Sequence, residues 1–216
     1  MCKRDFFSTL DKRVNLKHAL ISILFVLLVI SMVGIGIGHY LRQEEKVDPG
    51  NKLQVYEKVV LQQPQDVEGL VRLGYLNLTE NNYENALTYY QRAFDMAPDS
   101  PMVRFHMAIA YLAVEKYEES IALLEPLAAD GALNFDAHLT LGHAYYMAGS
   151  YDRAVVSLSK AVLIMPGAAN AHYLLGLCYE ELGDREQALK CLGKALKMVP
   201  DYQEAQQAVV RLSSAN

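Results

Sequence analysis

The sequence predicts an all-α protein that consists of stacked helix pairs behind an N-terminal transmembrane helix. Small and apolar residues recur at an interval of 34 residues over residues 67–202, and such a period is typical of a helical solenoid. A second observation is a run of twenty uncharged residues, ALISILFVLLVISMVGIGIG, at 19–38. This run is long enough to cross a hydrocarbon core of about 30 Å.

The basic residues near the amino end predict how this segment is oriented. Residues 1–18 carry a local net charge of +3, whereas the rest of the chain carries −8. Because positive flanks stay on the cytoplasmic side, we expect a basic cytoplasmic tail at 1–18, a transmembrane signal anchor at 19–41 and an extracytoplasmic domain after it. A cleaved signal peptide is the alternative, although its apolar run would be only about 7–15 residues long.

Turn residues separate the anchor from the repeats. The sequence Asp48-Pro49-Gly50 favours a turn, so residues 42–50 are predicted to form a linker. The repeats then divide into four units, at 67–100, 101–134, 135–168 and 169–202. Each unit is predicted to form two antiparallel helices, because its apolar residues follow helical spacing and its small residues recur where two helices would approach.

Recurring residues define the phase of these units. Three sets of residues recur at intervals of 34, one member of each set in every unit: Gly74, Ala108, Gly142 and Gly176; Ala86, Ser120, Ala154 and Ala188; and Pro98, Ala132, Pro166 and Pro200. Residues 51–66 continue the pattern backwards as a half repeat helix. Residues 203–216 are predicted to form a capping helix that covers the last apolar face.

Caps and breakers predict where several helices begin and end. Ser100 followed by Pro101 is typical of a helix start, and Ser150 and Asp184 are predicted to cap second helices. Pro126 falls inside the second helix of unit 101–134, so we expect a local kink there. The pair Asp130-Gly131 is expected to end that helix early.

These residues resemble the tetratricopeptide repeat (TPR) family. Residues 171–200, AHYLLGLCYEELGDREQALKCLGKALKMVP, are similar to the family pattern, and the resemblance covers 67–202. The tryptophan of many members is replaced at Leu70, Arg104, His138 and His172. The resemblance implies a right-handed superhelical solenoid with a concave groove that is lined by the first helix of each unit.

The resemblance also implies which residues line that groove. The family positions are occupied by Val71, Tyr75, Leu78, Phe105, Ile109, Leu112, Leu139, His143, Tyr146, Tyr173, Leu177 and Glu180. This surface is apolar and aromatic over three units and becomes acidic at Glu180 and Glu181, and about half of the residues are expected to pack between helices instead. Such a lining suits an extended or helical peptide with apolar anchors. The Lys and Asn clamp of the chaperone-tail-binding members is absent.

Other functional classes lack the residues they would need. The acidic domain has no basic stripe for nucleic acid, and no catalytic, phosphate-binding or zinc motif is present, so we predict a protein without cofactor, metal, small-molecule substrate or enzymatic activity. His138 and His172 are predicted to pack rather than bind metal or haem. Cys178 and Cys191 are interpreted as free packing cysteines, with a disulfide as the alternative.

The sequence therefore predicts a single-pass inner-membrane protein that binds a protein or peptide partner during assembly of an envelope complex. Three alternatives stay open on analogy alone: a cytochrome c maturation accessory, a pilus or secretion assembly factor, and an organelle import receptor of reversed topology. The sequence does not decide among these partners.

Overall fold

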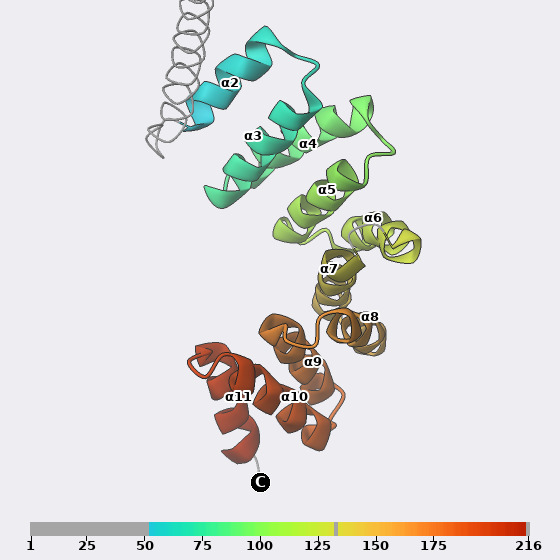
Figure 1. Cartoon of the computed structure of the whole chain (residues 1–216), viewed down its shortest axis with the longest axis vertical. Coiled ribbons are helices and arrows are strands. Elements are labelled where there is room, and N and C mark those ends of the chain that lie inside the picture. Colours follow the sequence, from blue (N-terminus) through green and yellow to red (C-terminus); the bar gives the residue numbers. More distant parts are fainter. Residues whose placement is uncertain (1–51, 132–133, 215–216) are drawn as a thin grey trace, which may run out of the picture. The chain divides into compact units, whose positions relative to one another are not determined.

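The computed structural model describes residues 52–131 and 134–214. The chain divides into a unit of residues 1–52 and a unit of residues 53–216. Apart from Lys52, the described residues belong to the second unit. They form ten α-helices and no strand, which confirms the predicted all-α class for this part of the chain. The helices are α2 (Lys52–Gln62), α3 (Val67–Thr79), α4 (Tyr83–Met96), α5 (Pro101–Ala113), α6 (Tyr117–Asp130), α7 (Asn134–Met147), α8 (Tyr151–Ile164), α9 (Ala169–Glu181), α10 (Arg185–Met198) and α11 (Gln203–Ser214) (Figure 1).

The predicted tail 1–18, anchor 19–41 and linker 42–50 lie outside the described residues. Among the helices that the structure does describe, none has the length and apolar character needed to cross a membrane.

Each repeat is a helical hairpin whose turn has the same backbone conformation. A left-handed residue follows the first helix of every unit: Asn81, Glu115, Gly149 and Gly183 all have φ between 61° and 76°. The next residue donates its backbone N–H to the carbonyl five residues back, as from Ser150 to Tyr145 at 2.8 Å. This bond satisfies a carbonyl at the helix end and reverses the chain.

The helices of a hairpin approach most closely at the small residue of the first helix. A Cβ atom added to Gly74 would lie 2.5 Å from the ring of Tyr90, and one added to Gly142 would lie 2.5 Å from Leu158 Cγ. Both opposing side chains are fully buried. Glycine is therefore required at these positions by the distance between the helices.

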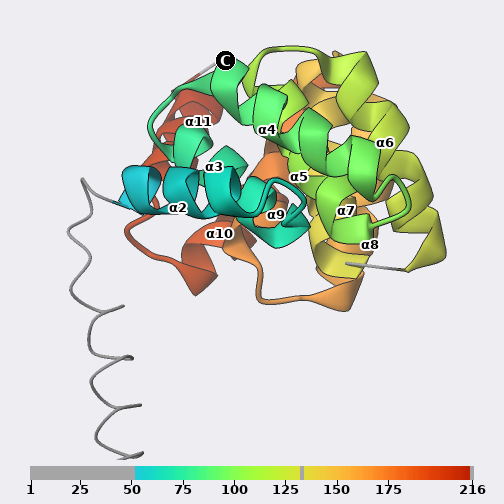
Figure 2. The same cartoon turned by 90° about the horizontal axis from the view of Figure 1, so that it is seen from above.

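Successive units contact one another mainly where the second helix of one unit packs against the first helix of the next, as α4 does against α5, α6 against α7 and α8 against α9. Helix α3 contacts α5, α5 contacts α7, α7 contacts α9 and α9 contacts α11, whereas the second helices α4, α6, α8 and α10 make no contact with each other within the described residues (Figures 1 and 2). The stack is therefore tighter on the side of the first helices. We call this side the first-helix face and the opposite side the second-helix face.

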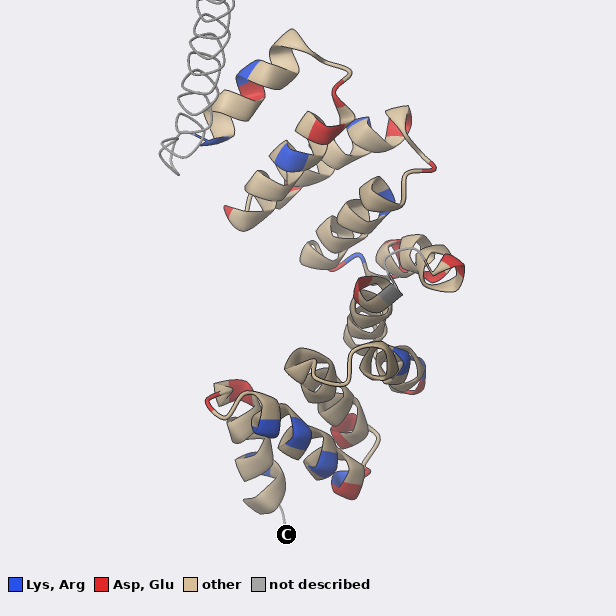
Figure 3. Cartoon of the chain, in the orientation of Figure 1, with Lys and Arg blue, Asp and Glu red and all other residues tan. Residues whose placement is uncertain are grey.

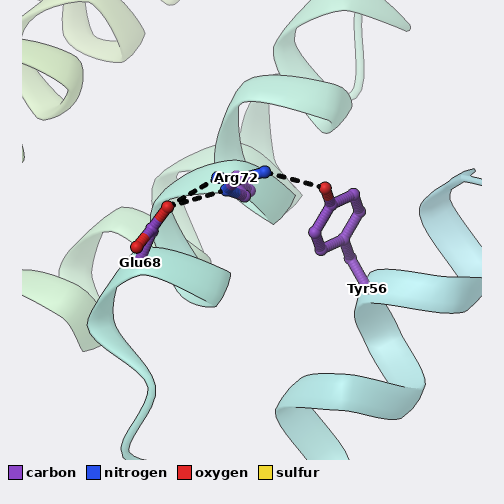
Figure 4. Close-up of polar contacts among 3 residues, drawn as sticks. All are labelled: Tyr56, Glu68 and Arg72. Atoms are coloured by element: carbon purple, nitrogen blue, oxygen red, sulfur yellow. Dashed lines mark hydrogen bonds and ion pairs between the residues drawn. The ribbon is translucent and has the colours of Figure 1, made fainter. Parts of the chain in front are cut away.

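Both ends of the stack are covered by an additional helix. Helix α2 places buried Val60 against the apolar core that contains Leu70 and Tyr90. The Tyr56 Oη atom accepts a 3.0 Å hydrogen bond from Arg72, which also contacts Glu68 (Figure 4). At the other end, α11 buries Ala205, Ala208 and Leu212 against α10. Each terminal helix thus covers an apolar face that would otherwise be exposed to water.

The predicted helix starts are partly right. Ser100 is the N-cap of α5 with a long 3.5 Å bond from Val103 N–H, and Asp184 accepts the Gln187 N–H at 3.0 Å before α10. Ser150 occupies the N-cap position of α8, but its side chain makes no capping bond.

The expectation that α6 ends early is wrong. Helix α6 contains 14 residues, as do α4, α8 and α10, and Pro126 lies inside it. It stops at Gly131, which adopts a left-handed conformation with φ 71°. The second helices of the other units end at a residue with negative φ, between −139° and −129°, that precedes a proline. Gly131 therefore ends α6 at the same position of the repeat with a different backbone conformation.

Candidate binding surfaces

Three predicted groove residues meet on the first-helix face. Ile109 and Leu112 from α5 and His143 from α7 line one open depression of about 340 Å³. The remaining lining residues are Ala113, Thr140 and Met147. The depression forms because α5 and α7 are neighbouring first helices that contact each other. Desolvation lowers the pKa of His143, so its imidazole is neutral at pH 7 and adds no charge to this apolar surface.

The other predicted groove residues differ in exposure. Tyr75 is 55% exposed, whereas Val71 is only 5% exposed and belongs to a core cluster. Val71 therefore packs between helices and is not available to a peptide, which corrects its assignment to the groove. The remaining members are partly buried: Leu78, Phe105, Leu139, Tyr146, Tyr173, Leu177 and Glu180.

Aromatic and acidic residues gather on the first-helix face near α9. The rings of Tyr173 and Tyr202 lie 5.0 Å apart. Glu180 receives two 2.7 Å hydrogen bonds from Arg211 of α11, so its charge is compensated within the chain. Glu181 is exposed, and its charge contributes, after burial, to raising the pKa of Tyr146. This end of the face is therefore aromatic and negatively charged.

A second hollow, which the sequence does not predict, lies on the second-helix face. This outer cleft measures about 280 Å³ and is lined by Glu125, Ala128 and Ala129 of α6, His138, Leu141 and Tyr145 of α7, and Arg153, Val156, Ser157 and Lys160 of α8. The signal that could have found it is the Ala128-Ala129 pair, because second helices in the other units carry larger residues at these positions.

One end of the outer cleft is closed by a group of three interacting side chains. Glu125 accepts hydrogen bonds from the Tyr145 hydroxyl and from Arg153, and the Arg153 guanidinium lies 4.2 Å from the centre of the Tyr145 ring. These contacts join α6, α7 and α8. The negative charge of Glu125 is therefore compensated by Arg153, which leaves Lys160 as the further charged group of the lining.

Buried histidines occupy the same position in two successive units. His138 is 7% exposed and its Nδ1 has no hydrogen-bond partner among the described residues. His172 likewise has an unpartnered Nδ1, although its Nε2 lies 3.0 Å from the Pro166 carbonyl. An unsatisfied buried polar atom costs about 1–3 kcal/mol. Burial, and secondly the charge of Lys160, lower the pKa of His138, so its ring is neutral.

The described residues contain no group of three or more His, Cys, Asp or Glu side chains that could hold a metal ion. Cys178 and Cys191 are both free and buried. Burial raises the pKa of Cys178 to about 12 and also raises that of Cys191. Both thiols are therefore protonated at neutral pH and lack the thiolate that reactive cysteines require.

Hairpins that recur at a constant length and pack successively against one another define a helical-repeat protein. The chain belongs to the tetratricopeptide repeat family: the sequence model of that family matches residues 77–141 and 145–212, which together exceed half of the chain. No sequence among the curated proteins matches the chain.

Several solved structures share this arrangement. A crystal structure of MamA is 26% identical, with a TM-score of 0.64 over 73% of this chain and 92% of that chain. MamA 41-end from Desulfovibrio magneticus RS-1 is 19% identical, with a TM-score of 0.67 over 79% and 96%. YrrB, described as a TPR protein with an unusual peptide-binding site, is 20% identical, with a TM-score of 0.64 over 81% and 89%. The last two likenesses bear on the fold alone.

Proposed function

We propose that this chain is a membrane-tethered scaffold that binds a protein or peptide segment on its first-helix face during assembly of a cell-envelope complex. The observation that carries this proposal is the depression between α5 and α7, where Ile109, Leu112 and His143 leave an apolar hollow open to solvent. An apolar hollow on a repeat surface gains free energy when a partner side chain fills it.

The lining selects the chemistry of the partner. The hollow accepts an apolar anchor, and the neutral ring of His143 offers one hydrogen bond at its edge. The exposed carboxylate of Glu181 lies on the following first helix, α9, beyond the hollow. A segment with apolar anchors followed by a basic residue would complement this face, whether it binds as an extended chain or as a helix. YrrB, a neighbour in fold, is described as having a peptide-binding site.

The apolar segment supplies the location. Residues 19–41 anchor the chain in the inner membrane, the basic residues 1–18 stay in the cytoplasm and the repeats lie outside it. The linker 42–50 spans at most about 30 Å when it is extended. The binding face is therefore held close to the bilayer, which raises its effective concentration toward other membrane-bound partners.

This proposal predicts that Ile109→Glu abolishes partner capture without unfolding the protein. A photo-cross-linking residue at Met147, which lines the hollow, captures the partner in cells, and the adduct is quantified for the full-length parent and the variant. The new carboxylate would be desolvated by an apolar anchor, so capture should fall by at least about tenfold. Helicity measured by circular dichroism should be unchanged, because Ile109 is only partly buried.

Two controls accompany this experiment. Val210→Glu introduces the same charge at a 67% exposed residue of α11 and should leave capture intact. A reporter that is active only after export, fused after Asn216, tests the location in the same strains. Equal capture by the Ile109→Glu variant would refute binding at this hollow, and an inactive reporter would refute the extracytoplasmic placement.

A further inference from the structure

The second helices present one exposed stripe of residues in the same phase of each unit. The stripe consists of Thr88, Arg92 and Asp95 in α4; Ala122, Pro126 and Ala129 in α6; Val156, Lys160 and Leu163 in α8; and Lys190, Lys194 and Lys197 in α10. Figure 3 shows the basic residues in a row along α10. The stripe is thus polar in the first unit and basic in the fourth, whereas the two middle units make it largely apolar.

The apolar residues of the third unit are strongly exposed. Val156 is 59% exposed and Leu163 is 80% exposed. Their counterparts in the fourth unit are Lys190 and Lys197, which solvate readily at such positions. A second helix that only faced water would be expected to carry polar residues at these positions, so the presence of Val156 and Leu163 in α8 needs another explanation.

Small side chains open the outer cleft at the same place. Ala128 stands where the other second helices have Phe94, Val162 and Leu196. Ser157 stands where the first two units have Tyr89 and Leu123. In the other units larger side chains fill this space. Between α6 and α8 it stays open, and Val156 lies at its rim.

The polar groups of the cleft have a positive excess. Arg153 compensates Glu125 at one end, as described above, and Lys160 has no ion-pair partner among the described residues. His138, more than nine-tenths buried in the lining, has an Nδ1 atom without a partner. A ligand that combines an apolar body with a negatively charged or hydroxyl group would satisfy both the surface and these polar groups.

We propose that the outer cleft between α6 and α8 is a second protein-binding site, which takes a segment of a partner protein with a large apolar or aromatic side chain next to Asp or Glu. The apolar side chain enters the space left by Ala128, Ala129 and Ser157. The adjacent carboxylate pairs with Lys160. Because this site lies on the second-helix face, it is separate from the hollow between α5 and α7, and one chain can hold two partners at once.

A phage-displayed library of random linear peptides tests the site. The bait is the full-length chain in detergent micelles with Ile109→Glu, so that the first-helix hollow is blocked. Selected peptides should carry an aromatic or large apolar residue beside Asp or Glu. Ala129→Leu, which introduces the residue that α8 has at this position, should weaken their binding by about tenfold by filling the cleft.

Matched variants separate cleft binding from other effects. Thr88→Leu makes a similar change on the stripe of α4 and should leave binding unchanged. Lys160→Glu should remove the preference for acidic peptides, which a merely structural role of Lys160 would not do. Failure to select peptides, equal binding to the Ala129→Leu variant, or peptides without an acidic bias would each overturn this assignment. The capture experiment at Met147 reports on the first-helix face independently.

Discussion

The second unit, residues 101–134, and the third unit, residues 135–168, have the same architecture with different residues at the positions that shape it. Both contain a hairpin with a second helix of 14 residues and a left-handed residue in the turn. At the close approach of the helices, the second unit has Ala108 where the third has Gly142. In the turn, Glu115 replaces Gly149.

The second helices of the two units differ as well. Pro126 in α6 stands where α8 has Lys160, and α6 ends at Gly131 instead of before a proline. The two helices of the second unit, α5 and α6, nevertheless pack closely, as the complete burial of Ala108 and Leu124 shows. The contacts between the helices therefore determine the architecture of a repeat, and a unit tolerates locally unfavourable residues while these contacts remain.

The largest effect is expected at the close approach of the helices in the third unit. Gly142→Ala would place a Cβ atom 2.5 Å from Leu158 Cγ, so the buried Leu158 side chain or the helix that carries it must shift. We expect a loss of about 2–3 kcal/mol in the free energy of unfolding, measured by denaturant titration. Ala108→Gly, the reverse change in the second unit, should cost only about 1 kcal/mol. Equal stability of the Gly142→Ala variant and the parent would show that the two hairpins do not differ in helix separation.

An intermediate gain is expected from removal of the proline in the second unit. Pro126→Lys introduces the residue that α8 has at this position and restores a backbone N–H in α6. Proline costs about 3 kcal/mol inside a helix, and loss of its constraint on the unfolded chain offsets up to about 1 kcal/mol. The free energy of unfolding should rise by about 2 kcal/mol. As a control, Lys160→Ala in α8 should change it by less than about 0.5 kcal/mol. An unchanged or lower stability would mean that α6 depends on the proline.

The smallest effect is expected in the hairpin turn. Glu115 has φ 61°, a conformation that costs a residue with a side chain about 1–2 kcal/mol, whereas Gly149 adopts φ 72° without this cost. Glu115→Gly should therefore stabilise the protein by about 0.5–1 kcal/mol, after allowance for the greater freedom of glycine in the unfolded chain. Thermal melting under matched conditions measures the shift. Gly149→Ala should shift the melting temperature downwards, and a shift in the same direction for both variants would contradict the role of the turn.

The sequence predicted most of the architecture because a strict period leaves few arrangements open. The interval from Gly74 to Gly142 spans two periods, and this spacing alone predicts where the hairpins lie. The same phase brought Ile109, Leu112 and His143 together as neighbours. The resemblance to the family assigns Val71 to the groove, whereas the structure buries it. Exposure depends on the surrounding helices, which the phase of one residue does not describe.

Local propensity and the 34-residue spacing were enough to predict the helix pairs, their order and the small residues between them, and these residues carry the resemblance to the TPR family. Three features depend on how the helices pack and could not be predicted in this way: Arg211 engages Glu180, α6 keeps its full length despite Pro126, and a cleft opens between α6 and α8. The reason is physical: an ion pair or a hollow depends on the distance between side chains from helices far apart in the chain, and the 34-residue period contains no information about that distance.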